Sequence, residues 1–320
     1  MSVTSAQQPS SAAVTGAILA DWRDSSHQST DNAPVNRKGR VRPRGRRSAT
    51  WMWNGVAVLL AALFGFPIYW MLITAFKTSA DINQLVPQFW PHHFTLRAFR
   101  EVLDDPIFRD DLRNSFVITL SAVVVSVVIG FFGALAIARF RFRGRRVFVV
   151  AVLLVQMIPL IALTVPLSLL LDSYQLKNTL PGVALAYLMF TTPYTVWTLR
   201  TFIANIPREL DEAALVDGCS RWQTFYKIIL PLVMPGLIAT GVYGWILAWN
   251  EFVFANTLLI DNNKQTAMVY LLVFQSSPTH GADYGGLMAA ATLTALPVVL
   301  LFAVFQSRIS TGLTAGAVKG

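Results

Sequence analysis

Beyond residue 50 the chain alternates long apolar stretches with shorter polar loops. Six of these stretches carry almost no charge, and they lie at about 53–76, 115–138, 147–171, 181–199, 233–260 and 286–306. A bilayer core about 30 Å thick takes roughly 20 helical residues to cross, so each stretch is long enough to span it. Only helices satisfy every backbone polar group in lipid when no barrel pattern is present. The pattern therefore predicts an all-α integral membrane fold with six transmembrane helices.

Residues 1–50 differ from everything that follows. They are rich in Ser, Gln, Asn, Thr and Pro, and seven of the eleven residues at 37–47 are basic. No apolar periodicity runs through them, which is typical of a disordered segment. We therefore expect a disordered basic tail over 1–50, a six-span membrane domain over 51–306 and a short tail over 307–320. On the side of the membrane that holds both tails, the longest internal loop is 200–232.

Composition and charge agree with a membrane protein. Apolar residues make up 54% of the chain and charged residues 13%, against roughly 25% charge in soluble proteins. The mean hydropathy is +0.51. These values argue against a soluble enzyme. The net charge of +9 still has to be explained, since a basic excess is also typical of proteins that bind nucleic acid.

The position of the basic residues explains the charge. The two tails and the loops 139–146 and 200–232 together hold 19 basic and 7 acidic residues, whereas the loops between them hold 7 and 9. Basic residues concentrate in cytoplasmic loops, so both termini are predicted to be cytoplasmic. The basic run at 37–47 then lies against the lipid bilayer, where the inner leaflet is anionic. No nucleic-acid partner is needed.

The loop 200–232 has strong local signals for two short helices. Pro207 suits a first helical position, and Gly218 can take the left-handed conformation that ends a helix. Ser220 followed by Gln223 is a capping-box pattern for a second helix. The residues expected to close that second helix are Pro231 and Pro235. From spacing alone, such an element either docks onto another protein or folds back onto its own bundle.

This loop resembles the EAA motif of ATP-binding-cassette importer permeases, which reads Glu-Ala-Ala, three residues, Gly, nine residues, Ile-x-Leu-Pro. The matching positions are Glu212, Ala213, Ala214, Gly218, Ile228, Leu230 and Pro231. A wider resemblance covers about 55–320 and includes Asn114-Ser115, Trp249-Asn250-Glu251-Phe252 and a Gly-rich end. Together they make the chain similar to the maltose-type permeases of the carbohydrate-uptake group, which have the type I ABC importer permease fold.

The resemblance implies a permease subunit of an ATP-driven, binding-protein-dependent sugar importer in the cell membrane of a prokaryote. Its partners would be a second permease subunit in a heterodimer, two ATP-binding subunits and an extracytoplasmic solute-binding protein. Glu212 would make an ionic contact with the ATPase, Gly218 would allow the bend between two coupling helices, and Leu313–Gly320 would be a second contact. No phosphate-binding GxxxxGK[ST] loop occurs in the chain. We therefore expect no enzyme activity and no cofactor in this subunit.

Polar residues inside spans are costly in lipid and usually face a partner helix or a water-filled path. The candidates for a translocation path are Gln156, Tyr243, Trp249, Asn250, Glu251 and Asn256. Interfacial anchoring of the tryptophans, and a place for Glu251 at the membrane boundary, are the competing interpretations. In another interpretation, the second permease subunit makes most of the contacts with the sugar. Two prolines, Pro159 and Pro166, are expected to kink the third span.

Three alternatives stay open. The same class of importer can carry a polyamine or a glycerol phosphate ester, but the predicted spans hold one acid, Glu251, and no Lys or Arg. A polytopic membrane enzyme would need His or paired Asp within the bilayer, and the predicted spans contain neither. A stand-alone transporter does not account for the ATPase-docking loop. A single cysteine, Cys219, and four scattered histidines give no metal-site pattern.

Overall fold

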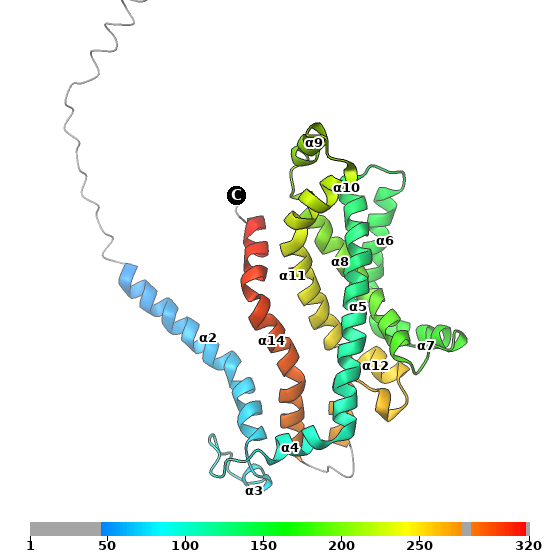
Figure 1. The fold of residues 1–320 in the computed structure, drawn as a ribbon. Helices are drawn as coiled ribbons and strands as arrows, with labels where there is room; N and C mark the ends of the chain where they lie inside the picture. The colour runs from blue at the N-terminus through cyan, green and yellow to red at the C-terminus, as the bar shows by residue number, and fades with distance from the viewer. Residues whose placement is uncertain (1–45, 277–282, 318–320) are drawn as a thin grey trace, which may run out of the picture. The chain divides into compact units, whose positions relative to one another are not determined.

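The protein is described here by a computed structural model, which covers residues 46–276 and 283–317. All regular structure in these ranges is helical, as predicted (Figure 1). The helices are α2 (Arg46–Ala75), α3 (Ser79–Ile82), α4 (Arg97–Asp104), α5 (Pro106–Arg139), α6 (Arg145–Met157), α7 (Thr164–Ser173), α8 (Leu180–Ala204), α9 (Glu209–Val216), α10 (Arg221–Thr224), α11 (Leu230–Trp249), α12 (Val253–Leu258), α13 (Ala267–Ser276) and α14 (Tyr284–Ala317), with the short turns η1 (Leu160–Leu163), η2 (Phe225–Ile229) and η3 (Asn262–Lys264). The chain divides into two compact units, 1–61 and 62–320, and every candidate site residue belongs to the second.

Several helices have the length and apolar character needed to cross a membrane. Within the described residues, four qualify: Trp51–Ala75 of α2, α5, the continuous stretch Arg221–Trp249, and Tyr284–Gln306 of α14. The bent pair formed by α6 and Leu160–Ser173 is a fifth if it counts as one span. Helix α8 covers the predicted fourth span and has 25 residues, but threonines and tyrosines make its middle less apolar. The count of six spans stays a prediction.

Some predicted boundaries need correction. The expected third span, 147–171, is bent by 94° at a break that contains Pro159, which confirms the kink predicted at that proline. Pro166 lies in the first turn of α7, where proline is tolerated. The expected fifth span, 233–260, stops at Trp249 and helix resumes at Val253.

The boundaries of the two predicted tails also differ from the helix boundaries in the structure. Helix α2 begins at Arg46, inside the predicted tail 1–50, and α14 continues through Ala317, well into the predicted tail 307–320. The rest of the two predicted tails, residues 1–45 and 318–320, lies outside the described residues.

The central helix pair is α5 and α8, which make the most extensive contact in the bundle. Their close approach depends on Gly130, where a Cβ atom would come within 2.5 Å of Cγ2 of Thr195. The hydroxyls of Ser126 and Thr195 are joined by a buried hydrogen bond of 2.9 Å. A small residue and a paired hydroxyl at one crossing are typical of membrane helix interfaces. Helix α11 packs against both α5 and α8.

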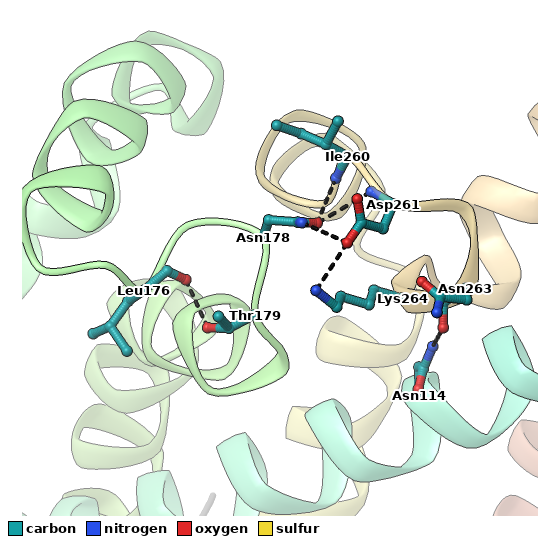
Figure 2. A network of polar contacts seen from close by, with 8 residues as sticks. All are labelled: Asn114, Leu176, Asn178, Thr179, Ile260, Asp261, Asn263 and Lys264. Carbon is teal, nitrogen blue, oxygen red and sulfur yellow. Dashed lines mark hydrogen bonds and ion pairs between the residues drawn. The ribbon is translucent and has the colours of Figure 1, made fainter.

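Away from the α9 end of the bundle, two loops are joined by the side chain of Asn178 (Figure 2). Its Oδ1 accepts hydrogen bonds from the backbone N–H groups of Ile260 (2.9 Å) and Asp261 (3.1 Å). Its Nδ2 donates to Oδ2 of Asp261 (2.8 Å), which also pairs with Nζ of Lys264 at 2.9 Å. The hydrogen bonds from Lys264 and Asn178 hold the pKa of the Asp261 carboxyl below its usual value. Asn178 itself has a left-handed backbone, with φ of 59°.

The start of α5 holds the segment that follows this network. Nδ2 of Asn114 donates to the carbonyl oxygens of Asn263 (3.0 Å) and Gln265 (3.1 Å). Oγ of Ser115 accepts from the backbone N–H of Ala267 (2.8 Å). The Asn114-Ser115 pair, found in the sequence through family resemblance, therefore supplies hydrogen-bond partners to the backbone from η3 to the first residue of α13.

Substituting Asn178 tests this network. We expect Asn178→Ala to lower the free energy of unfolding by about 1–2 kcal/mol through the lost hydrogen bonds, with about 1 kcal/mol more from alanine at positive φ. Asn178→Gly is the matched control, because it loses the same side-chain bonds without the backbone strain. Thermal unfolding of the purified protein in detergent measures both. Equal stability of the wild type and Asn178→Ala would contradict this role.

Candidate functional site

The loop between α8 and α11 forms a compact, capped element. Helix α9 ends before Gly218, which has φ of 81°, a conformation that glycine adopts at no steric cost. Ser220 and Gln223 form the predicted capping box: Oγ of Ser220 accepts from the Gln223 N–H (3.3 Å) and Oε1 of Gln223 accepts from the Ser220 N–H (2.7 Å). The two short helices predicted from the sequence are both present.

The second short helix does not close at a proline, which corrects the sequence-based expectation. Helix α10 passes through the π-helical turn η2 directly into α11, and Pro231 lies in the first turn of α11. The backbone N–H of Leu230 donates to the carbonyl of Phe225, a five-residue step. This wider turn shifts the hydrogen-bond register just ahead of Pro231, whose missing N–H is then tolerated at a helix start. Pro235 lies inside α11.

Two arginines fasten the loop to the end of α5. Nε of Arg139 lies 3.4 Å from Oδ2 of Asp211, and Nη1 of Arg139 donates to the carbonyl of Ile206 (3.1 Å). Nη2 of Arg208 donates to the carbonyl of Ala138 (3.1 Å) in return. The Arg139 side chain is only 8% exposed. These contacts bind α9 and the residues just before it to the last turn of α5, which itself runs the length of the bundle (Figure 1).

The inner face of the loop is packed. Ala214 is 3% exposed, and Ile229 joins a buried cluster with Leu199 and Ile203 of α8. A cavity of about 200 Å³ remains between this face and α5. Its lining residues are Leu135, Arg139, Phe140, Asp211, Leu215, Arg221, Thr224, Phe225 and Ile229.

The outer face of the loop is apolar and uncovered in this chain. Glu212, Ala213 and Pro231 are exposed, and Ile228 and Leu230 are half-buried. Beside them lie large apolar side chains that we call the docking surface. Its members, with their exposed fractions, are Leu210 (41%), Leu215 (49%), Val216 (87%), Trp222 (65%) and Tyr226 (50%). Leu215 also lines the cavity described above. Large exposed apolar side chains gathered on one short loop are typical of interaction sites.

Two of the predicted path residues have structural roles. Trp249 is 3% exposed, and its Nε1 donates to the carbonyl of Thr294 (3.1 Å). The carboxylate of Glu251 accepts from the N–H groups of Phe254 (2.9 Å) and Ala255 (3.2 Å), so it caps α12 after the break at Asn250. Neither side chain presents an open polar surface, because both are committed to the packing of this chain.

The other predicted path residues are accessible. Gln156 on α6, Asn250 at the end of α11 and Asn256 on α12 are exposed. Tyr243 on α11 is 47% exposed, with its ring 4.7 Å from that of Tyr194. Their part in a translocation path stays a prediction. Among the residues that the structure describes, no three His, Cys, Asp or Glu side chains are placed to hold a metal ion.

Known proteins resemble this chain over most of its length. Residues 113–314 match the family described as "Binding-protein-dependent transport system inner membrane component". The diacetylchitobiose uptake system permease protein of Streptomyces coelicolor is 40% identical over 267 residues, which cover 83% of this chain and 96% of that protein. The trehalose/maltose transport system permease protein of Thermococcus litoralis is 35% identical, over 82% of this chain and 95% of the relative.

Solved structures share the fold. A chain of a bacterial ABC transporter involved in the import of the acidic polysaccharide alginate superposes with a TM-score of 0.69 at 24% identity. The superposition covers 82% of this chain and 97% of that one. At this identity the likeness establishes the arrangement of the helices, which is that of ABC importer transmembrane subunits.

The Arg139 contacts make a prediction about the loop. Arg139→Met keeps the aliphatic stem but leaves Asp211 and the Ile206 carbonyl without their partner, which we expect to cost about 2–3 kcal/mol. Amide hydrogen exchange across residues 206–224 should rise at least tenfold. Arg143→Met is the matched control, because Arg143 is exposed on the neighbouring loop and takes no part in these contacts. Unchanged exchange in Arg139→Met would show that the loop is held by other means.

Proposed function

The chain belongs to the family of binding-protein-dependent transport system inner membrane components, and from that premise we propose that it is the permease subunit of an ATP-driven sugar importer. It is a multi-pass transporter subunit of the bacterial inner membrane rather than an enzyme. A solute-binding protein is implied by the family's description. The loop with its exposed docking surface carries the rest of the proposal.

The docking surface is proposed to seat in a groove of an ATP-binding subunit. Exposed aromatic and aliphatic side chains supply area to bury, and the exposed carboxylate of Glu212 supplies a charge for a basic residue of the ATPase. Aromatic residues are enriched in such contacts. A second permease subunit would complete the translocation path, and two ATP-binding subunits would then engage one loop from each permease.

The packing of the loop supports a coupling role. A movement of the ATPase would act on α9, and the contacts of Arg139 and Arg208 would pass it to α5. The turn η2 is continuous with α11, so the same movement would act on that helix directly. Packed helices move as rigid bodies when they shift between two arrangements. The loop would thus rock α5 and α11 together and open the path alternately to each side.

A sugar is the proposed cargo. The relatives named above are described as permeases for diacetylchitobiose and for trehalose/maltose, at 35–40% identity over most of the chain. A neutral sugar needs hydrogen-bond partners and aromatic faces rather than buried charge. Tyr243 with Tyr194, and the amides Asn250 and Asn256, are the accessible residues on α11, α8 and α12 that could supply them.

The coupling claim is tested by substituting the exposed carboxylate. We expect Glu212→Lys to lower sugar-stimulated ATP hydrolysis of the assembled importer by about tenfold or more, because like charges would oppose each other at the docked face. Gly218→Trp should weaken assembly further, since a bulky residue at φ of 81° displaces the second coupling helix. Co-purification with the ATP-binding subunit and hydrolysis in proteoliposomes measure both effects.

Glu209→Lys is the matched control for charge. Glu209 lies on the same short helix, is also exposed, and undergoes the same change of two charges outside the motif. It should leave hydrolysis within about twofold of the wild type. Normal assembly and normal stimulated hydrolysis in a Glu212→Lys, Gly218→Trp double variant would overturn the proposed coupling.

A further inference from the structure

An open cavity of about 750 Å³ lies beside the start of α6 and contains an unusual concentration of arginine. Its lining residues are Arg141, Phe142, Gly144, Arg145, Arg146, Val147, Val149, Val150 and Arg200. Four of the nine are arginines and none is acidic. We call this the arginine cavity. It is separate from the docking surface and from every residue proposed for the translocation path.

No acidic side chain in the described part of the chain pairs with the arginines of the cavity. The ion pairs among described residues link other groups, and none includes Arg141, Arg145, Arg146 or Arg200. Nε of Arg200 is buried without a hydrogen-bond partner, although its guanidinium lies 5.1 Å from the ring of Trp197. Four positive charges gathered without a counter-charge repel one another, so the arginine cavity is suited to an anion. Arginine pairs especially well with phosphate, in a two-pronged geometry.

The apolar surroundings show which phosphate source fits. Val147, Val150 and Leu154 follow one face of α6 at i, i+3 and i+7, and are 72%, 52% and 56% exposed. This exposed stripe begins at the arginine cavity and runs along α6 away from it. A small phosphate ion would leave the stripe uncovered, whereas the acyl chains of a lipid would lie along it. Trp197 is 37% exposed beside Arg200, as interfacial tryptophans commonly are.

We propose that the arginine cavity binds the headgroup phosphate of an anionic glycerophospholipid of the inner leaflet. Its volume equals that of about 25 water molecules at about 30 Å³ each, so a phosphoglycerol headgroup fits with part of its hydration. Basic pockets between transmembrane helices on the cytoplasmic side are suited to such headgroups. The proposal rests on the proposed function in one respect, the orientation of the chain in the membrane. Because α9 and the start of α6 lie at the same end of the bundle (Figure 1), a cytoplasmic α9 puts the arginine cavity on the cytoplasmic side as well.

The site connects lipid to the coupling loop through α5. Arg141 lies just after the end of α5, where Arg139 holds α9, and Arg145 begins α6. A lipid bound here would fix the short 140–144 connection against α8, which contributes Arg200. The loop end of the bundle would therefore be better ordered in a membrane that contains anionic lipid than in a neutral one.

The test measures lipid retained by the complete importer. The complex is purified from nanodiscs that contain phosphatidylcholine with a small fraction of phosphatidylglycerol, and bound lipid is counted by native mass spectrometry. Arg146→Gln and Arg143→Gln form a matched pair, since each removes one exposed charge at or beside the start of α6 and only Arg146 lines the cavity. Retention of phosphatidylglycerol should fall about fivefold in Arg146→Gln and stay unchanged in Arg143→Gln.

A triple variant gives the larger effect. Arg141→Gln, Arg145→Gln, Arg146→Gln should lose about a hundredfold in retention. Inorganic phosphate or glycerol phosphate at millimolar concentration should not displace the lipid. Displacement by these ions would identify a small-anion site and overturn the proposal. Equal loss in Arg143→Gln and Arg146→Gln would overturn it too, by showing a general charge effect.

Two further outcomes separate this claim from the others. Unchanged lipid retention with reduced co-purification of another subunit in Arg146→Gln would assign the cavity to an acidic protein surface and contradict the lipid site. Reduced lipid retention with normal sugar-stimulated hydrolysis would support the lipid site independently of coupling. Lipid retention is read on the assembled complex, so a failure of the transport proposal leaves this measurement interpretable.

Discussion

A backbone polar group left without a partner in lipid costs several kcal/mol, and this constraint organises the structure. Helices satisfy the constraint along most of the bundle. Where a helix stops, a polar side chain supplies the missing partners: Glu251 for the start of α12, and Asn114 for the segment before α13. Asn178 does the same for Ile260 and Asp261 in an exposed loop. The polar residues of these segments therefore serve the fold first, and only the exposed remainder is available to a substrate.

The loop between α8 and α11 is likewise held by satisfied hydrogen bonds, which suits it to the coupling role proposed above. Its capping box and the left-handed Gly218 satisfy the loop internally, while Arg139 and Arg208 exchange hydrogen bonds with the end of α5. A loop fixed in this way moves with the helices instead of bending independently. Its apolar side chains are left facing outward, where a partner can cover them.

Local signals in the sequence predicted much of this architecture. The capping box at Ser220, the turn at Gly218 and the break at Pro159 each depend on neighbouring residues, and all three are present. The helix end at Trp249 has no such signal, because no Gly or Pro lies between it and Val253. The apolar pattern therefore predicts one continuous span that contains Glu251. The pairing of Arg139 with Asp211 joins distant segments, and no local pattern could have shown it.

The proline at 231 shows a different limit. A proline usually ends a helix, but here the π-helical turn η2 shifts the backbone register ahead of it, so that α10 and α11 run on without a break. Rules for helix ends consider one helix at a time. In the fold, Ile229 and Phe225 pack against the α5–α8 pair, and this packing favours a continuous helix from α10 through η2 into α11. That continuity joins the docking surface to a membrane helix.

Site-directed cross-linking tests the central claim most directly. Cys219 is the only cysteine, so a Cys219→Ser background accepts single cysteines at Val216 on the docking surface and at Val86 on a different loop; these side chains are 87% and 74% exposed. The account predicts that Val216→Cys cross-links to the ATP-binding subunit of the assembled importer, and that Val86→Cys does not. Cross-linking of that subunit to Val86→Cys, with none at Val216→Cys, would contradict it.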